Sequence, residues 1–115
     1  MVALAVVAAA PIFAYGRVSG NIRAERVTIA RGGIVSVNSI AMGRQVSARR
    51  LASLQALARR ERFAAMPARS ICSASLPDFA TRYITYRART VRVRGSCSKR
   101  FDALYTALTR ATGVP

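Results

Sequence analysis

Histidine and tryptophan are absent from the sequence, and only 4 of its 115 residues carry a carboxylate side chain. Without histidine, the chain cannot form histidine-based metal sites, Ser-His-Asp triads or histidine general bases. Three carboxylates have structural interpretations: Glu61 lies among arginines, Asp78 follows a proline in a turn, and Asp102 favours the dipole at a helix start. We therefore predict that the protein is not an enzyme and holds no metal or cofactor.

Cysteine is scarce, because Cys72 and Cys97 are the only two in the chain. Two thiols cannot form a four-thiolate zinc site within one chain. In exported proteins an even pair of cysteines usually forms a disulfide. A Cys72–Cys97 disulfide would close a loop of about 26 residues, which the chain-entropy model values at about 3.5 kcal/mol. The alternative is a pair of buried free cysteines.

Charged side chains are missing from residues 1–15, whereas arginines are scattered through the chain from Arg17 onward. An apolar run of this length fits the hydrophobic region of a signal peptide, and it is too short to span about 30 Å of hydrocarbon as a helix. The small residues Ala14 and Gly16 suit cleavage before Arg17. We expect residues 1–16 to be a signal peptide or apolar leader and residues 17–115 to form a single α+β domain. Because the segment lacks a basic start, a buried first strand or helix is the alternative.

Hydrophobic periodicity predicts four strands and two helices in the remainder of the chain. The pair Gly32 and Gly33 suits the tight turn of a first hairpin, and Ser47 suits a helix N-cap. Residues 42–45 are expected to form a connection, and residues 67–78 a loop. The predicted strands are 24–31, 34–40, 81–87 and 90–94, and the predicted helices are 48–65 and a last helix that is capped by Ser98 and ends at Gly113.

The resulting order, ββαββα, predicts an α+β fold. A four-stranded antiparallel sheet with one buried face offers the two amphipathic helices a common apolar surface, so both helices should pack on that face. The single disulfide would join the loop before the third strand to the start of the last helix. It would thereby hold that helix against the sheet.

Positive charge dominates the chain, because 19 lysines and arginines oppose 4 acidic residues and give a formal net charge of +15. Such a field attracts nucleic acid, acidic cell-wall polymers and anionic lipid headgroups. On the second hairpin, arginines alternate with Tyr83 and Tyr86, as on surfaces where guanidinium groups meet phosphates and rings stack on bases. A solvated outer sheet face is the alternative. The candidate polyanion surface consists of Arg82, Arg87, Arg89, Arg92 and Arg94.

Several short segments between about Val27 and Leu108 resemble a known family. The run VTIARGGIVSV, the helix end RFAAMPA, the strands PDFATRYITY and RTVRV, and the closing FDALYTAL follow in the order found in that family. In these features the chain resembles emfourin-type small protein inhibitors of thermolysin-like metallopeptidases. The resemblance implies a protease inhibitor without enzymatic activity, and it assigns no contact residues.

Two functional hypotheses follow from the sequence. The first is a small exported, non-enzymatic interaction domain whose partner is another protein, with a peptidase among the candidates. The alternative is an electrostatic binder of nucleic acid or another anionic polymer. Both imply a secreted or cell-envelope location, periplasmic or extracellular, with no transmembrane anchor after cleavage. Neither implies a small-molecule substrate.

Overall fold

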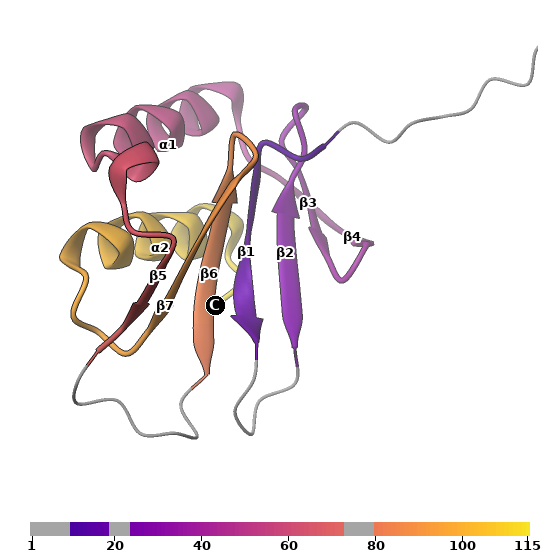
Figure 1. Cartoon of the computed structure of the whole chain (residues 1–115). Coiled ribbons are helices and arrows are strands. Elements are labelled where there is room, and N and C mark those ends of the chain that lie inside the picture. Colours follow the sequence, from indigo (N-terminus) through magenta and orange to yellow (C-terminus); the bar gives the residue numbers. More distant parts are fainter. Residues whose placement is uncertain (1–9, 19–23, 73–79) are drawn as a thin grey trace, which may run out of the picture.

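A computed structural model describes residues 10–18, 24–72 and 80–115. Within these ranges the chain forms one seven-stranded sheet, two α-helices and a short 3₁₀-helix, η1 (Figure 1). The strands follow each other across the sheet in the order β4-β3-β2-β1-β6-β7-β5. The elements are β1 Phe13–Val18, β2 Glu25–Ile29, β3 Ile34–Val37, β4 Ile40–Gln45, α1 Ala48–Arg60, η1 Phe63–Ala65, β5 Arg69–Ile71, β6 Thr81–Tyr86, β7 Arg89–Arg94 and α2 Lys99–Thr112.

Strand β1 lies at the centre of the sheet, where it pairs antiparallel with β2 on one side and with β6 on the other. Its residues Phe13 and Tyr15 are fully buried. The expected boundary between residues 16 and 17 therefore falls inside this strand, and the folded domain takes in Phe13–Gly16 as well. The segment follows the alternative of a buried first strand, and it resembles a leader because Phe13–Gly16 are all buried and uncharged. Residues 1–9 lie outside the described residues.

Both helices lie on the same face of the sheet, as expected (Figure 1). The Ser47 hydroxyl accepts from the backbone N–H of Arg50 and caps α1, and the Ser98 hydroxyl caps α2 through Phe101. The apolar stripes of both helices face the sheet and meet Phe13, Ile29 and Ile84 in one core. The buried helix residues are Leu51, Leu54 and Ala58 of α1 and Phe101, Leu104, Tyr105, Leu108 and Thr112 of α2.

The predicted hairpins are confirmed. Strands β2 and β3 pair antiparallel across the Gly32–Gly33 turn, where Gly33 has a φ of +87° and a Cβ would lie 2.0 Å from the Val46 carbonyl oxygen. Strands β6 and β7 also pair antiparallel. Their turn places Arg87 and Ala88 in the left-handed region, with φ of 50° and 60°.

The predicted four-stranded sheet and its ββαββα order are wrong, because β4 and β5 were not expected as strands and β1 was expected only as the alternative to a leader. Residues 42–45, expected to be a connection, belong to the edge strand β4, and the strand predicted over 34–40 is divided by a turn at Asn38 and Ser39. Within the loop expected over 67–78, β5 pairs parallel with β7. Hydrophobic alternation does not reveal these strands, because β4 is exposed along its whole length and β5 has only three residues.

The first predicted helix also ends earlier than expected. Helix α1 stops at Arg60, and Arg62 takes a left-handed φ of 53° before η1 begins. This break turns the chain back toward the sheet, where Phe63 is buried. A continuous helix to residue 65 would keep the α1 direction at this point and would not make this turn. Among the described residues, neither helix is long and apolar enough to cross a membrane.

Candidate functional site: the open face of the sheet

The helices cover one face of the sheet, and the other face, here called the open face, carries the side chains that alternate with the core residues. Along β1, β2 and β6 the core positions Tyr15, Val27 and Ile84 pair with one another, so their immediate neighbours point to the open face. One cross-strand row on that face contains five small residues, four of which carry a hydroxyl group. It consists of Ser36, Thr28, Ala14, Thr85 and Thr90.

The next cross-strand row on the open face is basic. Strand register aligns one residue from each of β2, β1, β6, β7 and β5. In that order they are Arg26, Gly16, Tyr83, Arg92 and Arg69. Four strand spacings separate the two ends of this row, which corresponds to about 19 Å. The three arginines are exposed. Together with Arg94, which lies on the same face two residues beyond Arg92, they form the open-face arginine row: Arg26, Arg69, Arg92 and Arg94.

The middle of this row is kept flat by Gly16. A Cβ at this position would lie 1.9 Å from the Glu25 carbonyl oxygen and 3.1 Å from the Tyr83 hydroxyl. The phenol of Tyr83 therefore lies over the glycine and is itself largely buried, with 8% of its surface exposed. An aromatic ring packed over a strand glycine supports pairing at that point. Tyr83 thus belongs to the floor of the open face and presents little ring surface for stacking.

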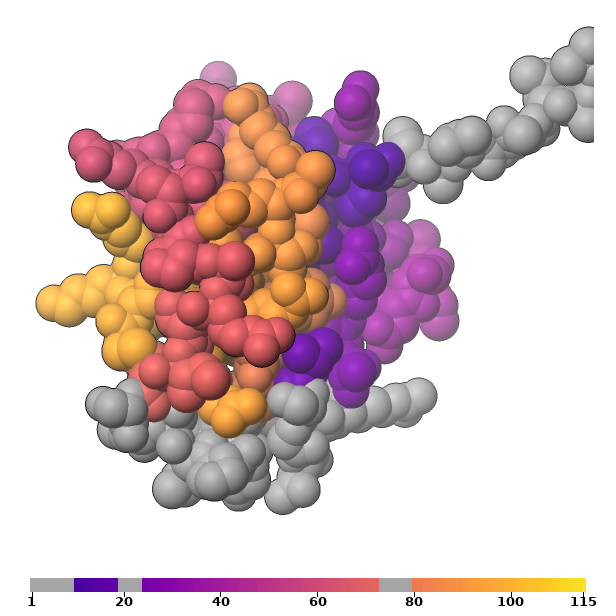
Figure 2. All heavy atoms as spheres, in the orientation of Figure 1, coloured from indigo at the N-terminus to yellow at the C-terminus, as the bar shows by residue number. Residues whose placement is uncertain are grey.

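A groove of about 250 Å³ lies where β5 and β7 meet on this face. Figure 2 shows these two segments side by side at the molecular surface. Three arginines line the groove together with hydroxyl groups and the exposed side chain of Ile71. The Nε atom of Arg94 is buried and has no hydrogen-bond partner among the described residues. The full lining is Val18, Arg69, Ser70, Ile71, Thr81, Arg92 and Arg94.

Carboxylates in the described ranges do not neutralise this face. Glu25 lies on the helix face and approaches Arg17 to 3.8 Å, and Asp102 lies on α2. Glu61 follows the last turn of α1. Asp78 lies outside the described residues. The open-face arginines therefore have no acidic side-chain partner among the described residues.

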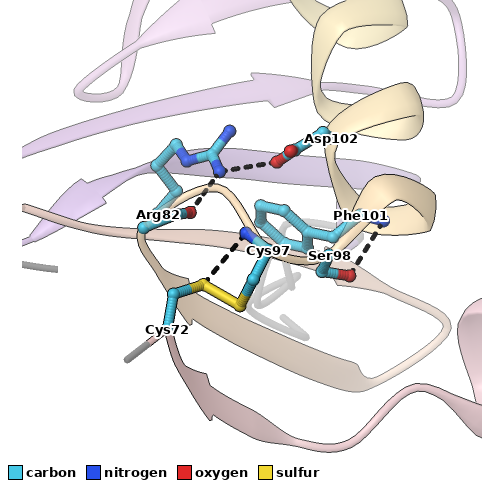
Figure 3. Close-up of polar contacts among 7 residues, drawn as sticks. Cys72, Arg82, Cys97, Ser98, Phe101 and Asp102 are labelled. Atoms are coloured by element: carbon cyan, nitrogen blue, oxygen red, sulfur yellow. Dashed lines mark hydrogen bonds and ion pairs between the residues drawn. A yellow bond between two sulfur atoms is a disulfide. The ribbon is translucent and has the colours of Figure 1, made fainter. Parts of the chain in front are cut away.

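The five arginines predicted as one polyanion surface are divided by the structure. Arg82 points to the helix face, where one guanidinium nitrogen donates to the Asp102 carboxylate at 2.6 Å and to the Gly95 carbonyl oxygen at 2.8 Å (Figure 3). Its guanidinium carbon lies 5.2 Å from the ring centres of both Phe101 and Tyr105. Arg82 is therefore a structural link between β6 and α2.

Two more of the five lie away from the open face. Arg89 shares the face of Val91 and Val93 and donates to the Met66 carbonyl oxygen. Arg87 lies at the hairpin turn, its guanidinium carbon 5.4 Å from the ring centre of Tyr86. Of the five predicted arginines, only Arg92 and Arg94 lie on the open face.

Two further arginines, Arg26 and Arg69, lie on the open face and were not among the five predicted residues. For Arg26 the signal was present, because it alternates with Val27 and Ile29 in a predicted strand. Arg69 could not be found in this way, because β5 is too short to show a pattern.

The predicted disulfide is confirmed. Cys72 and Cys97 are bonded, with their Cα atoms 5.6 Å apart. Cys72 follows β5 directly, and Cys97 immediately precedes the Ser98 cap of α2 (Figure 3). The bond therefore ties the end of the edge strand β5, and with it one wall of the groove, to the start of α2.

Two buried tyrosines have perturbed pKa values on the helix face. Burial raises the pKa of Tyr15 to about 12, against a partly opposing hydrogen bond from Thr112. Burial also raises the pKa of Tyr105, and the charges of Arg17 and Arg82 offset part of that effect. The Tyr15 hydroxyl donates to the Val114 carbonyl oxygen at 2.6 Å, which fastens the chain after α2 to the central strand. These contacts give Tyr15 a structural role.

Within the described ranges, no three metal-ligating side chains of the His, Cys, Asp or Glu type come together. No family model matches this chain, and searches of curated proteins and of solved structures give no match. The resemblance to emfourin-type inhibitors stays a prediction.

Proposed function

We propose that the protein is a non-enzymatic interaction domain that holds a phosphate-bearing polymer against the open face of its sheet. The observation that carries this proposal is the open-face arginine row, which spans five strands, carries arginines on three of them (β2, β7 and β5) and has no acidic partner among the described residues. A row of cations about 19 Å long suits an extended chain of charges better than a single small anion. The net charge of +15 adds long-range attraction for such a chain.

Phosphate is favoured as the repeating group because guanidinium groups bind it through paired, charge-assisted hydrogen bonds. The groove between β5 and β7 supplies such donors from Arg69, Arg92 and Arg94, with the hydroxyls of Ser70 and Thr81 beside them. Because Tyr83 is largely buried, base stacking contributes little. We therefore propose recognition of the phosphate backbone without sequence preference. A disulfide in so small a domain supports a secreted or cell-envelope location, which is part of this proposal.

The test measures binding of the full chain to a fluorescent single-stranded oligothymidine at several salt concentrations. Because each phosphate that a cation neutralises contributes about 0.7 to the magnitude of the slope of log K against log salt for single strands, the variant Arg69→Gln/Arg92→Gln should lower that magnitude by about 1.4. The matched control is Arg49→Gln/Arg60→Gln, which removes the same charge from α1. The control should retain a slope close to that of the unmodified protein.

Two results would contradict the proposal. The first is an equal loss of slope in both double variants, which would make net charge alone responsible. The second is binding that does not weaken with salt.

Inorganic polyphosphate serves as a competitor without bases, and it should displace the oligonucleotide if the backbone alone is recognised.

A second candidate function is docking of a protein partner along β4. Among the described strands, β4 pairs only with β3, and all six of its residues are exposed. Ile40 and Met42 are 68% and 46% exposed, an unusual composition for an unprotected edge. An extended segment of another protein can add to such an edge through backbone hydrogen bonds. A peptidase remains a candidate partner on the resemblance described above.

Inhibition assays against a panel of secreted metallopeptidases test this second candidate. The full chain should slow at least one peptidase, and Ile40→Lys should weaken that effect because an edge lysine opposes strand addition. Equal activity of every peptidase with and without the protein would remove the inhibitor interpretation.

A further inference from the structure

A second cavity, away from the open face, lies between the end of α1, η1 and the turn of the β6–β7 hairpin. Its volume is about 420 Å³. Its floor is apolar and built from core residues: Ala58, Phe63 and Tyr86 are all less than 6% exposed. The rings of Phe63 and Tyr86 meet edge to face at 6.0 Å between their centres. Volumes of about 300–1,000 Å³ are typical of small-molecule sites.

The rim of this cavity is cationic. Four of the nine lining residues are arginines and none is acidic: Arg59, Arg62, Arg87 and Arg89. One guanidinium nitrogen of Arg89 donates to Met66, while its Nε atom is buried without a hydrogen-bond partner among the described residues. A buried donor without an acceptor costs free energy. An anion that reaches this Nε atom would satisfy it.

Two of these arginines have strained backbone conformations. Arg62 and Arg87 both have left-handed φ angles, 53° and 50°, which are unfavourable for residues other than glycine. Glycine or asparagine would adopt the same angles at lower cost. Non-glycine residues in this region often mark ligand-binding positions. The strain thus falls on two charged residues of the rim.

A second hollow continues this cavity. It has a volume of about 520 Å³ and shares Tyr86 and Arg87 with the first. Its lining also includes Ala10, Pro11 and Ile12, which precede the central strand. An apolar chain that covers Tyr86 can therefore extend from one hollow into the other.

We propose that this cavity binds a single-chain aliphatic carboxylate. The carboxylate accepts from the guanidinium groups of Arg87 and Arg89, and the hydrocarbon chain covers Phe63 and Tyr86. The four cations favour an anionic head over a neutral one, and the apolar floor favours a hydrocarbon tail over a free inorganic anion. This site is separate from the open-face arginine row and does not depend on the function proposed for it.

Calorimetric titration of the full chain with decanoate, below its micelle-forming concentration, tests the proposal. Decanol keeps the tail and lacks the charge, whereas acetate keeps the charge and lacks the tail. Both should bind at least tenfold more weakly than decanoate. The variant Arg62→Gly/Arg87→Gly removes two rim charges at positions where glycine relieves strain, so it should unfold at the same or a higher temperature. Its affinity for decanoate should fall about tenfold, because the variant removes Arg87, one of the two guanidinium groups that contact the carboxylate.

The control variant Arg69→Gln/Arg92→Gln lies on the open face and should bind decanoate as tightly as the unmodified protein. A folded Arg62→Gly/Arg87→Gly protein with unchanged decanoate affinity would overturn the proposal. So would equal binding of decanoate and decanol, or of decanoate and acetate. As a second measurement, Ala65→Trp should fill the cavity from its exposed lining and abolish decanoate binding without loss of the fold.

Discussion

Removal of the first 16 residues should prevent the protein from folding. A chain that starts at Arg17 lacks Phe13 and Tyr15, both fully buried. Loss of one large aromatic side chain from a core costs about 3–5 kcal/mol, so the two together cost about 6–10 kcal/mol. Domains of this size have a total stability of about 5–15 kcal/mol. The same truncation also separates β2 from β6, because β1 is the strand that joins them.

Circular dichroism during urea titration measures this effect. The matched control is a chain that starts at Ala10, which keeps β1 and the hydrogen bond from the Ile12 N–H to the Ile29 carbonyl oxygen. This control should unfold cooperatively at the midpoint of the full chain. The shorter chain should show no cooperative transition. A cooperative transition within about 1 kcal/mol of the full-length free energy of unfolding would refute the reasoning, because the extrapolation error is smaller than the expected loss.

The same argument constrains any processing of the chain. If a leader is removed during export, cleavage must occur before Ile12 to leave the central strand intact. Mass spectrometry of the exported protein would identify the mature N-terminus. A folded mature protein that begins at Arg17 would contradict the role assigned to β1.

Three further predictions concern stability. Reduction of the Cys72–Cys97 disulfide should lower the free energy of unfolding by about 3.5 kcal/mol, and urea titration with and without reductant checks this. The variant Ala88→Gly should raise the free energy of unfolding by about 1 kcal/mol, because glycine relieves the left-handed strain at φ 60°, and thermal unfolding measures it. Because the folded state holds Tyr15 neutral, stability should be lost as the pH rises from the unfolded value of 10.0 to about 12, by about 1.4 kcal/mol per pH unit. In the Tyr15→Phe variant, the free energy of unfolding should fall less steeply over this pH range than in the unmodified protein, and urea titration at several pH values measures this.

The hairpins and helices could be predicted because their signals are local. Gly32 and Gly33 identify one turn, serine caps begin both helices, and apolar periodicity defines their buried faces. Strand β1 has no such signal, because Phe13–Gly16 are all buried and uncharged and so continue the apolar composition that also fits a leader. Strand β5 forms through parallel pairing with β7, a long-range contact that three residues cannot encode locally.

The candidate site was predictable in part, and alternation would have predicted more of it. Arg82 has the same parity as Ile84 in β6, and Arg89 the same parity as Val91 in β7. A strict period of two assigns both arginines to the helix face, where the structure places them. Grouping the hairpin arginines by sequence proximity therefore mixed two faces of one sheet. The groove beside Ile71 required knowledge of β5 and could not be derived from the pattern.

The two faces of the sheet use arginine in different ways, and this difference supports the proposed binding role over simple solubility. On the helix side, Arg82 is held by Asp102, while Arg44 donates to the Thr112 and Gly113 carbonyl oxygens at the end of α2. Such arginines join elements and are already satisfied. On the open face, Arg69 and Arg92 lie in adjacent strands with no side-chain partner among the described residues. Like charges side by side in a sheet are destabilising, so charge needed only for solubility would be better dispersed over the helices. Their adjacency favours an anionic partner that offsets this repulsion when it binds.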